Sequence, residues 1–210
     1  IKNSPFMVTF EDGRPSEYST ASGDGLTLAY TDTLTYFQVF AYDVRNNRRS
    51  TGGDTYQFTL HGANNYTGYL VPCPKPPAAQ TGEAHHAICD PYDVEEGHYY
   101  GVYTPLYTGI TVLSVYVFNS THATDDAVVL QHITGSPWLP TVLPNTQDPY
   151  TSDIDGDIYD TIAGKTQTMQ IQLRDVNGNK LISGGHSLEL CMYGVASEWG
   201  TIVPWGSTPG

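Results

Sequence analysis

The sequence predicts an all-β protein that contains one structural unit twice, and a repeated stretch is the first observation that leads to this prediction. Residues 43–54 read DVRNNRRSTGGD, and residues 175–186 read DVNGNKLISGGH. The offset of 132 residues is kept outside this stretch, where Ser4-Pro5 recurs as Ser136-Pro137. A fixed period without insertions is typical of tandem repeats.

Hydrophobic alternation on both sides of the repeated stretch is the second observation. Apolar residues at every other position predict strands with one buried face. In the first copy, the apolar residues are Phe37, Val39 and Ala41 before the loop and Tyr56, Phe58 and Leu60 after it. In the second copy, they are Met169, Ile171 and Leu173 before the loop and Leu188, Leu190 and Met192 after it. The Asp-x-x-x-Asn segment and the Gly pair between them predict an ordered turn, because Asp and Asn bond nearby backbone and Gly supplies positive φ. The repeated unit is therefore strand, ordered loop, strand, in an antiparallel β sandwich.

Taken in order, the chain predicts one complete unit, one partial unit and a spare strand. Strands are expected at about 34–42, 55–61, 66–71, 96–105 and 109–118, after a weak strand within 11–26 and before a closing strand at 133–142. Residues 11–142 form the complete domain. Residues 143–210 match 11–78 and carry no counterpart of 79–132, so this second domain is partial. Residues 1–10 match 133–142 and are expected to be the closing strand of a preceding repeat, at a processed end or at a cut through a longer chain.

An ordered set of motifs resembles the filamin-type immunoglobulin-like repeat. The set comprises the repeated Asp-to-Gly-Gly stretch, Ser4-Pro5-Phe6 with Ser136-Pro137-Trp138, Gly23-Asp24-Gly25-Leu26, the strand from Gly97 through Tyr99 to Tyr103-Thr104-Pro105, and Gly109. The resemblance covers nearly all of residues 11–142 and implies tandem seven-stranded immunoglobulin-like sandwiches, one complete and one partial. The second copy departs from the pattern, because Asp155-Gly156-Asp157-Ile158 replaces the first Gly-Asp-Gly-Leu motif.

Composition and motifs exclude several classes of function. The net charge is −13 with only 9 Lys and Arg, and no basic cluster is present, so we expect no nucleic-acid partner. No run of about eighteen apolar residues occurs, so no membrane span is expected. Neither a nucleophile-elbow sequence nor an HExxH motif is present, and we expect no enzymatic activity.

The three cysteines predict one disulfide. Cys73 and Cys89 flank a Pro-rich segment that is an insertion relative to typical filamin repeats, and a disulfide between them would close and restrain this loop. The alternative is two unrelated free thiols. Cys191 is left over, either as an exposed thiol or bonded to a partner outside this chain. His85-His86 lies in the same loop without further metal ligands at fixed spacing, so we interpret it as solvated.

An acidic cluster is the candidate metal site. It consists of Asp153, Asp155, Asp157 and Asp160, with Asp148 nearby. Closely spaced carboxylates suit calcium, although the spacing is not that of an EF-hand. The alternative is a solvated acidic linker between the domains. No other cofactor is expected.

The leading hypothesis is a structural subunit of an extracellular, glycosylated filament or surface appendage, which assembles with itself head to tail. The residues expected at the contact are Ser4, Pro5, Phe6, Leu188, Leu190 and Met192. One rival is a cell-surface adhesion module, similar to the filamin-like ectodomains of gamete-surface proteins. Another is a carbohydrate-binding module, in which Trp199 and Trp205 would stack on sugars. An intracellular actin crosslinker fits the predicted disulfide and glycosylation signals poorly.

Two N-glycosylation signals give the first testable prediction. Asn65-Tyr66-Thr67 and Asn119-Ser120-Thr121 both match the acceptor pattern and fall at predicted strand ends or loops, so we expect N-glycans on both Asn65 and Asn119. Mass spectrometry of tryptic peptides from native material checks this. Unmodified asparagine at both positions would remove the main support for an extracellular protein.

Overall fold

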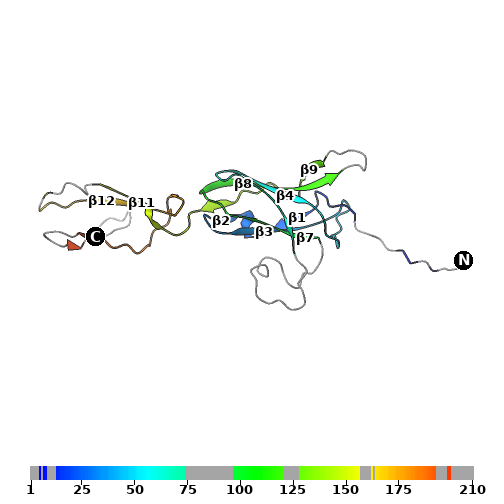
Figure 1. The fold of residues 1–210 in the computed structure, drawn as a ribbon, viewed down its shortest axis with the longest axis horizontal. Coiled ribbons are helices and arrows are strands. Elements are labelled where there is room, and N and C mark those ends of the chain that lie inside the picture. The colour runs from blue at the N-terminus through cyan, green and yellow to red at the C-terminus, as the bar shows by residue number, and fades with distance from the viewer. Residues whose placement is uncertain are drawn as a thin grey trace. The chain divides into compact units, whose positions relative to one another are not determined.

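The computed structural model describes residues 13–73, 97–120, 128–156 and 164–192, together with residues 5, 7, 8, 162, 198 and 199. The chain divides into two compact units, unit 1 (residues 1–145) and unit 2 (residues 146–210), whose elements are labelled in Figure 1. The division falls just after the predicted boundary at residue 142. Asn145 belongs to unit 1 because its N–H donates to Thr31 Oγ1 at 2.9 Å and its Nδ2 donates to Thr33 Oγ1 at 3.1 Å.

Unit 1 is a sandwich of two β-sheets. The four-stranded sheet has the order β1 (Thr20–Ser22), β3 (Thr35–Phe40), β7 (His98–Tyr103), β6 (Val71–Pro72). The six-stranded sheet has the order β2 (Leu28–Tyr30), β10 (Thr141–Leu143), β8 (Gly109–Ser120), β4 (Tyr56–Gly62), β5 (Tyr66–Tyr69), with β9 (Val128–His132) also on β8. Strands β2 and β10 pair in parallel, and the other pairings in unit 1 are antiparallel.

The strand segments described in unit 1 correspond to seven sandwich strands, because three of the seven are divided. The first crosses from one sheet to the other as β1 and β2, joined through the 3-10 helix η1 (Asp24–Leu26). The fourth crosses at Leu70 as β5 and β6, and the last runs along β8 as β9 and β10. The predicted antiparallel immunoglobulin-like sandwich is therefore confirmed.

The predicted closing strand at 133–142 is wrong in its bounds. Strand β9 ends at His132 and β10 begins at Thr141, so most of the predicted range lies between them. This connection still follows β8, because Trp138 and Leu113 exchange two backbone hydrogen bonds of 2.8 and 2.9 Å. The strand is interrupted because Pro137 has no N–H to donate and Gly135 adopts a positive φ of 86°.

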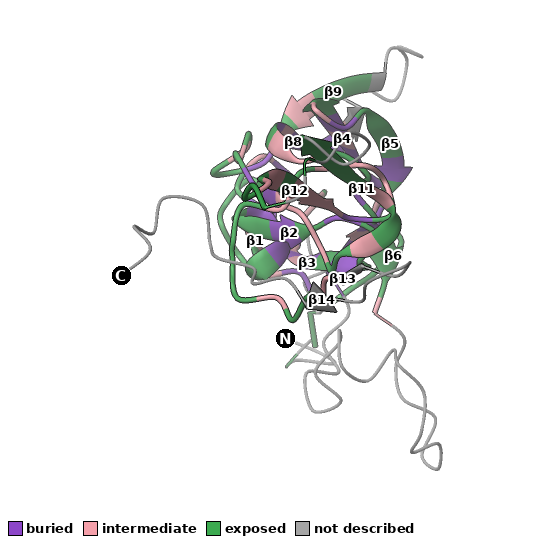
Figure 2. Ribbon diagram, turned by 90° about the vertical axis from the view of Figure 1, so that its left-hand side faces the viewer, coloured by how far each residue is buried: buried purple, intermediate pink, exposed green. Residues whose placement is uncertain are grey.

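The core between the two sheets of unit 1 combines aliphatic side chains with aromatic rings that pack against one another, and Figure 2 shows where the buried residues lie. The rings of Phe37 and Phe58 meet edge to face with their centroids 5.4 Å apart, and those of Tyr56 and Tyr99 are 5.0 Å apart. The buried hydroxyls find partners: Tyr56 Oη lies 2.8 Å from Ser19 Oγ, and Tyr99 Oη accepts the N–H of Asp54 at 2.9 Å. Burial also raises the pKa of Tyr99 to about 12.

Unit 2 contains two separate pairs of strands within its described residues. Strand β11 (Asp148–Gly156) pairs with β12 (Met169–Arg174), and β13 (Cys191–Met192) pairs with β14 (Glu198–Trp199). The strand predicted around Leu188 and Leu190 is wrong, because regular structure begins only at Cys191. The corresponding strand of unit 1, β4, is held between β8 and β5, and the described part of unit 2 has no strand in the place of β8. Backbone without a partner strand cannot form a ladder.

Two predicted segments lie largely or wholly outside the described residues. The spare strand at 1–10 lies outside them, apart from residues 5, 7 and 8. The Pro-rich loop at 74–88, with His85-His86, also lies outside them. For membrane spans there is a direct finding, because in the described ranges no helix is long and apolar enough to cross a membrane.

A glycine in β7 gives the second testable prediction. Gly101 lies opposite Phe37 in the β3–β7 pair, and a methyl group added to it would collide with the Phe37 ring. We expect Gly101→Ala to lower the free energy of unfolding of unit 1 by about 1 to 3 kcal/mol, measured by denaturant titration. Gly52→Ala is the matched control, because a Cβ there meets only the Tyr99 hydroxyl at 4.0 Å. Equal stability of the two variants would contradict the tight packing of Phe37 over β7.

Candidate assembly surface

The ordered loop after β3 is built around the carboxylate of Asp43. Its Oδ1 accepts the N–H groups of Arg45 at 2.9 Å and Asn47 at 2.8 Å, and its Oδ2 accepts Asn47 Nδ2 at 3.1 Å. The Asp43 N–H donates to the Asn47 carbonyl at 3.0 Å, which closes the loop. The hydrogen bonds from Asn47 lower the pKa of Asp43 from its ordinary value, and the bond from the Asn47 backbone has the largest effect.

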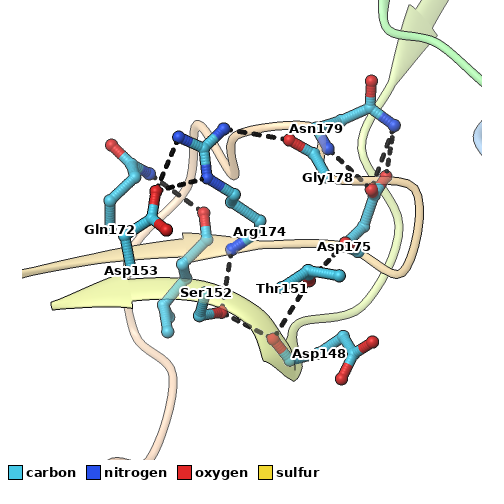
Figure 3. Close-up of polar contacts among 10 residues, drawn as sticks. Asp148, Thr151, Ser152, Asp153, Gln172, Arg174, Asp175, Gly178 and Asn179 are labelled. Atoms are coloured by element: carbon cyan, nitrogen blue, oxygen red, sulfur yellow. Dashed lines mark hydrogen bonds and ion pairs between the residues drawn. The ribbon is translucent and has the colours of Figure 1, made fainter.

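The loop after β12 repeats this arrangement around Asp175 (Figure 3). Asp175 Oδ1 accepts the N–H groups of Asn177 at 3.0 Å and Asn179 at 2.9 Å, and Asn179 Nδ2 reaches the two carboxylate oxygens at 3.0 and 2.9 Å. Gly178 has φ 79° where Asn46 has φ 61°, so both loops use a positive φ at the same place. The turn predicted from the Asp-x-x-x-Asn pattern is confirmed in both units.

Polar side chains tie the Asp175 loop to the β11–β12 pair (Figure 3). The Arg174 guanidinium contacts Asp153 Oδ2 through Nε at 2.8 Å and Nη2 at 2.7 Å, and its Nη1 donates to the Gly178 carbonyl at 3.0 Å. The hydroxyl of Thr151 donates to the Asp175 carbonyl at 2.7 Å. These contacts hold the hairpin and its loop together locally, without requiring the second sheet of a sandwich.

The apolar side chains of unit 2 lack the cover that their counterparts have in unit 1. Asp175 is the only fully buried residue among those whose burial is described in unit 2. Leu188 is 38% exposed, whereas Tyr56, at the same position of the repeat, is 0% exposed. Leu190 is half-buried, whereas its counterpart Phe58 lies in the core. The residues that form a core in unit 1 therefore form an open surface in unit 2.

Strand β12 also has an open edge. In unit 1, β3 lies between β1 and β7, but in the described part of unit 2 β11 is the only strand that pairs with the corresponding β12. At the other edge, the chain returning from the Asp175 loop reaches only the end of β12, where the Leu181 N–H donates to Leu173 O at 2.9 Å. The N–H of Arg174 faces β11, because it donates to Ser152 Oγ at 3.0 Å. Backbone groups alternate along a strand, so the N–H groups of Ile171 and Leu173 face the opposite edge. In unit 1, Ala41 occupies the position of Leu173 and donates its N–H to Gly97 O at 2.8 Å, next to β7.

We call this region the β12 assembly surface. The name covers two features of unit 2, the outer edge of β12 at Met169, Ile171 and Leu173 and the apolar side chains of Leu188 and Leu190. Of the contact residues predicted from the sequence, Leu188 is exposed and Leu190 is half-buried, and their role in assembly stays a prediction. Ser4, Phe6 and the side chain of Met192 lie outside the described residues, and Pro5 is exposed.

The predicted calcium site is only partly described. Asp153 is engaged by Arg174, and Asp155 Oδ1 accepts the N–H of Gly156 at 2.8 Å. Asp157 and Asp160 lie outside the described residues. Within the described ranges, no three His, Cys, Asp or Glu side chains gather as metal ligands would. Calcium binding therefore stays a prediction.

The predicted glycosylation and cysteine sites differ in how far the structure describes them. Asn65 is exposed and directly precedes β5, whereas the side chain of Asn119, near the end of β8, lies outside the described residues. Cys73 is disulfide-bonded and Cys191 has a free thiol. Cys89, the partner predicted for Cys73, lies outside the described residues, as does Trp205. Glycosylation at both sequons stays a prediction.

Two groups of structural residues were missed by sequence reasoning. Asn64 is buried beside the sequon; its Nδ2 donates to Tyr107 O at 2.7 Å and its Oδ1 accepts the N–H of Leu106 at 2.8 Å. Arg49 forms a buried ion pair with Asp54 at 2.9 Å. The sequence gives little sign that Asn64 is buried, apart from a second Asn beside the sequon. Its hydrogen-bond partners, Leu106 and Tyr107, lie in the loop before β8, far away in the sequence. The Arg49–Asp54 ion pair is easier to predict from the sequence, because the two opposite charges lie on either side of the Gly pair.

Comparisons with known proteins found matches among solved structures. No known family profile matches the chain, and no curated protein matches it. Among solved structures it is similar to the Lin-41 filamin domain, with 17% identity and a TM-score of 0.38, over 62% of this chain and 97% of that domain. It is also similar to FdeC, an Escherichia coli adhesin, with 15% identity and a TM-score of 0.49, over 83% of this chain and 46% of FdeC.

The Asp175 loop gives the third testable prediction. We expect Asp175→Ala to abolish the exchange protection of the Asn177 and Asn179 amides, because it leaves their N–H groups without the buried carboxylate that accepts them. Amide hydrogen exchange of the full chain, followed by NMR, measures this. Asp153→Ala is the matched control, because it removes only an exposed ion pair, of the kind worth about 0 to 1 kcal/mol. Unchanged protection in Asp175→Ala would show that the carboxylate does not organise the loop.

Proposed function

We propose that this chain is a structural subunit of an extracellular, glycosylated protein filament or surface appendage, assembled head to tail through its immunoglobulin-like units. The observation that carries this proposal is the β12 assembly surface. The role is non-enzymatic, and its principal partner is another copy of the same chain. Covalent glycans on Asn65 and Asn119 belong to the proposal.

The physical reason for assembly is that unit 2 exposes apolar side chains whose counterparts are buried in the core of unit 1. Covering one large apolar side chain is worth roughly 1.5 to 3 kcal/mol, so covering Leu188 and Leu190 provides a substantial driving force. An open strand edge also presents unpaired backbone groups, which favour pairing with another strand. Among the described residues, the N–H groups of Ile171 and Leu173 face the edge where unit 1 receives β7, and no strand pairs with them there.

The proposed occupant is the amino-terminal segment, residues 1–10, of the next copy. At the offset of 132 residues, Ile1 and Phe10 correspond to Ile133 and Val142, and both of these are buried in unit 1. Phe6 corresponds to Trp138, which packs against the core of unit 1. The segment thus has the apolar pattern of a closing strand. Because such a contact joins two different surfaces, it propagates as a filament instead of closing on itself.

The amino-terminal segment supplies only part of what unit 2 lacks. In unit 1, β7 pairs with β3 and β8 pairs with β4. The described part of unit 2 has no counterpart of β7 or of β8. We propose that a further strand pairs with the β12 edge, either from a neighbouring copy or from chain that follows residue 210. Covalent continuation would produce the same interface as assembly between copies.

Two described features support the extracellular part of the proposal. Disulfides persist in oxidising compartments, and Cys73 is disulfide-bonded. The Asn65 sequon is exposed directly before β5, where a glycosylation enzyme would reach it.

A cell-surface adhesion module is the second candidate function. The same open edge of β12 favours it, because an extended segment of a different protein can add to an exposed strand. In that case purified protein would remain as discrete particles until the partner is supplied.

The fourth testable prediction concerns assembly. We expect the protein to form filaments by negative-stain microscopy and light scattering, and we expect deletion of residues 1–10 or Ile171→Pro to prevent this. Proline at 171 removes a backbone donor from the open edge of β12 and leaves the donors that face β11. Val176→Pro is the matched control, because Val176 is the exposed second residue of the turn that the Gly178 N–H to Asp175 O bond closes at 2.8 Å.

The results separate the two candidates. Filaments from Val176→Pro but not from Ile171→Pro support assembly through the β12 edge. Discrete particles of the unaltered protein contradict the filament and favour the adhesion module. Filaments that form equally well with Ile171→Pro show that assembly uses another surface.

A further inference from the structure

The outer face of the six-stranded sheet in unit 1 is free of charged side chains. Strands β4, β5, β8 and β9 contain none of the 9 Lys and Arg or 22 Asp and Glu of this chain. These strands lie side by side, with β8 between β4 and β9 and with β5 at the edge. A face without charges is notable in a chain whose net charge is −13, because it disfavours partners that need a counter-charge.

A row of ring and hydrogen-bonding side chains crosses this face. Gln57 is directly opposite Tyr69 of β5 on one side and Tyr116 of β8 on the other, and Tyr116 is opposite His132 of β9. Directly opposed residues point to the same face of a sheet. The backbones of Tyr69 and Tyr116 are about 9.5 Å apart, which is twice the spacing between neighbouring strands. Tyr69 is 61% exposed and His132 is also exposed.

The rings are held by one another in two pairs. Tyr69 lies against Phe118 with ring centroids 6.2 Å apart, and Tyr116 lies against His132 with centroids 4.4 Å apart. Leu130 is exposed and lies opposite Phe118. The two pairs give a preformed aromatic surface around Gln57, so little side-chain entropy remains to be lost on binding.

A hydrogen bond to Ser136 holds the imidazole of His132 in place. Ser136 Oγ accepts the N–H of Val115 at 2.9 Å, and it lies 2.8 Å from His132 Nδ1. When the hydroxyl donates to Nδ1, the neutral imidazole carries its proton on Nε2. In that tautomer His132 offers a hydrogen-bond donor beside the Tyr116 ring.

We propose that this face, made by Tyr69, Gln57, Tyr116, Phe118 and His132, binds a neutral, unbranched, β-linked glycan. Pyranose rings present flat C–H surfaces that stack on aromatic side chains, and their hydroxyls bond to an amide and an imidazole N–H between the rings. A β-1,4-linked chain is extended, so successive sugar rings can lie along the row of side chains that crosses the strands. The site is independent of the β12 assembly surface, because its residues belong to unit 1 and those of the assembly surface to unit 2.

A peptide fits this face less well than a glycan. Strand addition would place a peptide along the outer edge of β5 and not across the row of side chains, because β4 and β8 are each paired along both edges. An acidic glycan would meet no basic side chain from these strands, while the chain as a whole would repel it.

Isothermal titration calorimetry of the full chain with soluble β-1,4-linked hexasaccharides of glucose, N-acetylglucosamine and mannose tests the proposal. We expect at least one of them to bind, and we expect Tyr69→Ala and Tyr116→Ala each to weaken that binding about tenfold. His132→Phe keeps a ring beside Tyr116 and removes the hydrogen-bonding nitrogens, so we expect a smaller loss of affinity than in the two alanine variants. Tyr36→Ala is the control, because Tyr36 is an exposed tyrosine on β3 of the other sheet, and its affinity should match the unaltered protein.

Four outcomes would overturn the proposal. The first is no heat of binding from any of the three sugars at millimolar concentration. The second is a loss in Tyr36→Ala as large as in Tyr116→Ala, and the third is equal binding of polygalacturonate. The fourth is NMR shifts on sugar addition that bypass Tyr69, Gln57 and Tyr116 in the unaltered protein. If Tyr116→Ala instead abolishes self-association and no sugar binds, the face contacts a second copy of the chain and the glycan proposal is wrong. The assembly proposal rests on residues of unit 2 and is tested by Ile171→Pro, so failure of sugar binding leaves it standing.

Discussion

A carboxylate that accepts hydrogen bonds from the loop that follows it is the interaction on which both units depend. Asp175 comes directly after β12 and Asp43 three residues after the end of β3, and each receives two backbone N–H groups and the amide of an Asn four positions on. The loop that results brings the chain back beside the strand it left, where Arg49 donates to Ala41 O at 3.0 Å and Leu181 donates to Leu173 O at 2.9 Å. Because all these contacts are local, the loop forms in the same way whether or not a second sheet covers the strand. This explains how unit 2 retains an ordered hairpin although no second sheet covers it among the described residues.

The two units differ in what surrounds this shared loop. In unit 1 the strands on either side are built into opposite sheets, and the core closes around Phe37, Phe58 and Tyr99. The loop itself is linked to that core by the buried Arg49–Asp54 pair, and Asp54 donates its N–H to Tyr99 Oη. In unit 2 the same two positions hold Leu181 and His186, and the strand after the loop has no ladder in the described residues. Unit 1 therefore has finished sheet faces, whereas the described part of unit 2 has an open edge at β12 and exposed apolar side chains.

The sequence predicts the fold wherever local pattern decides it, and fails where distant pairing decides it. The alternation around Val39 and Phe58 and the Asp-x-x-x-Asn pattern are local, and the strands and loops they predict are present. The closing strand was misplaced because its bounds depend on which residues of β8 it meets, and the motif Ser136-Pro137-Trp138 lies in the interruption itself. Leu188 and Leu190 have the alternation of a strand, yet a strand also needs a neighbour, which pattern does not reveal. The row through Gln57 likewise depends on the register of β4 with β5 and β8, which is not visible in the sequence.

Hydrogen exchange at β12, compared between dispersed and assembled protein, tests the central claim most directly. The claim is that unit 2 holds a preformed hairpin whose outer edge is open. It predicts that in dispersed protein the Asn179 amide, bonded to the buried Asp175, exchanges slowly while the Ile171 and Leu173 amides exchange fast. In assembled protein the Ile171 and Leu173 amides should become protected as well. Fast exchange at Asn179 in dispersed protein, or fast exchange at Ile171 and Leu173 after assembly, would contradict the account.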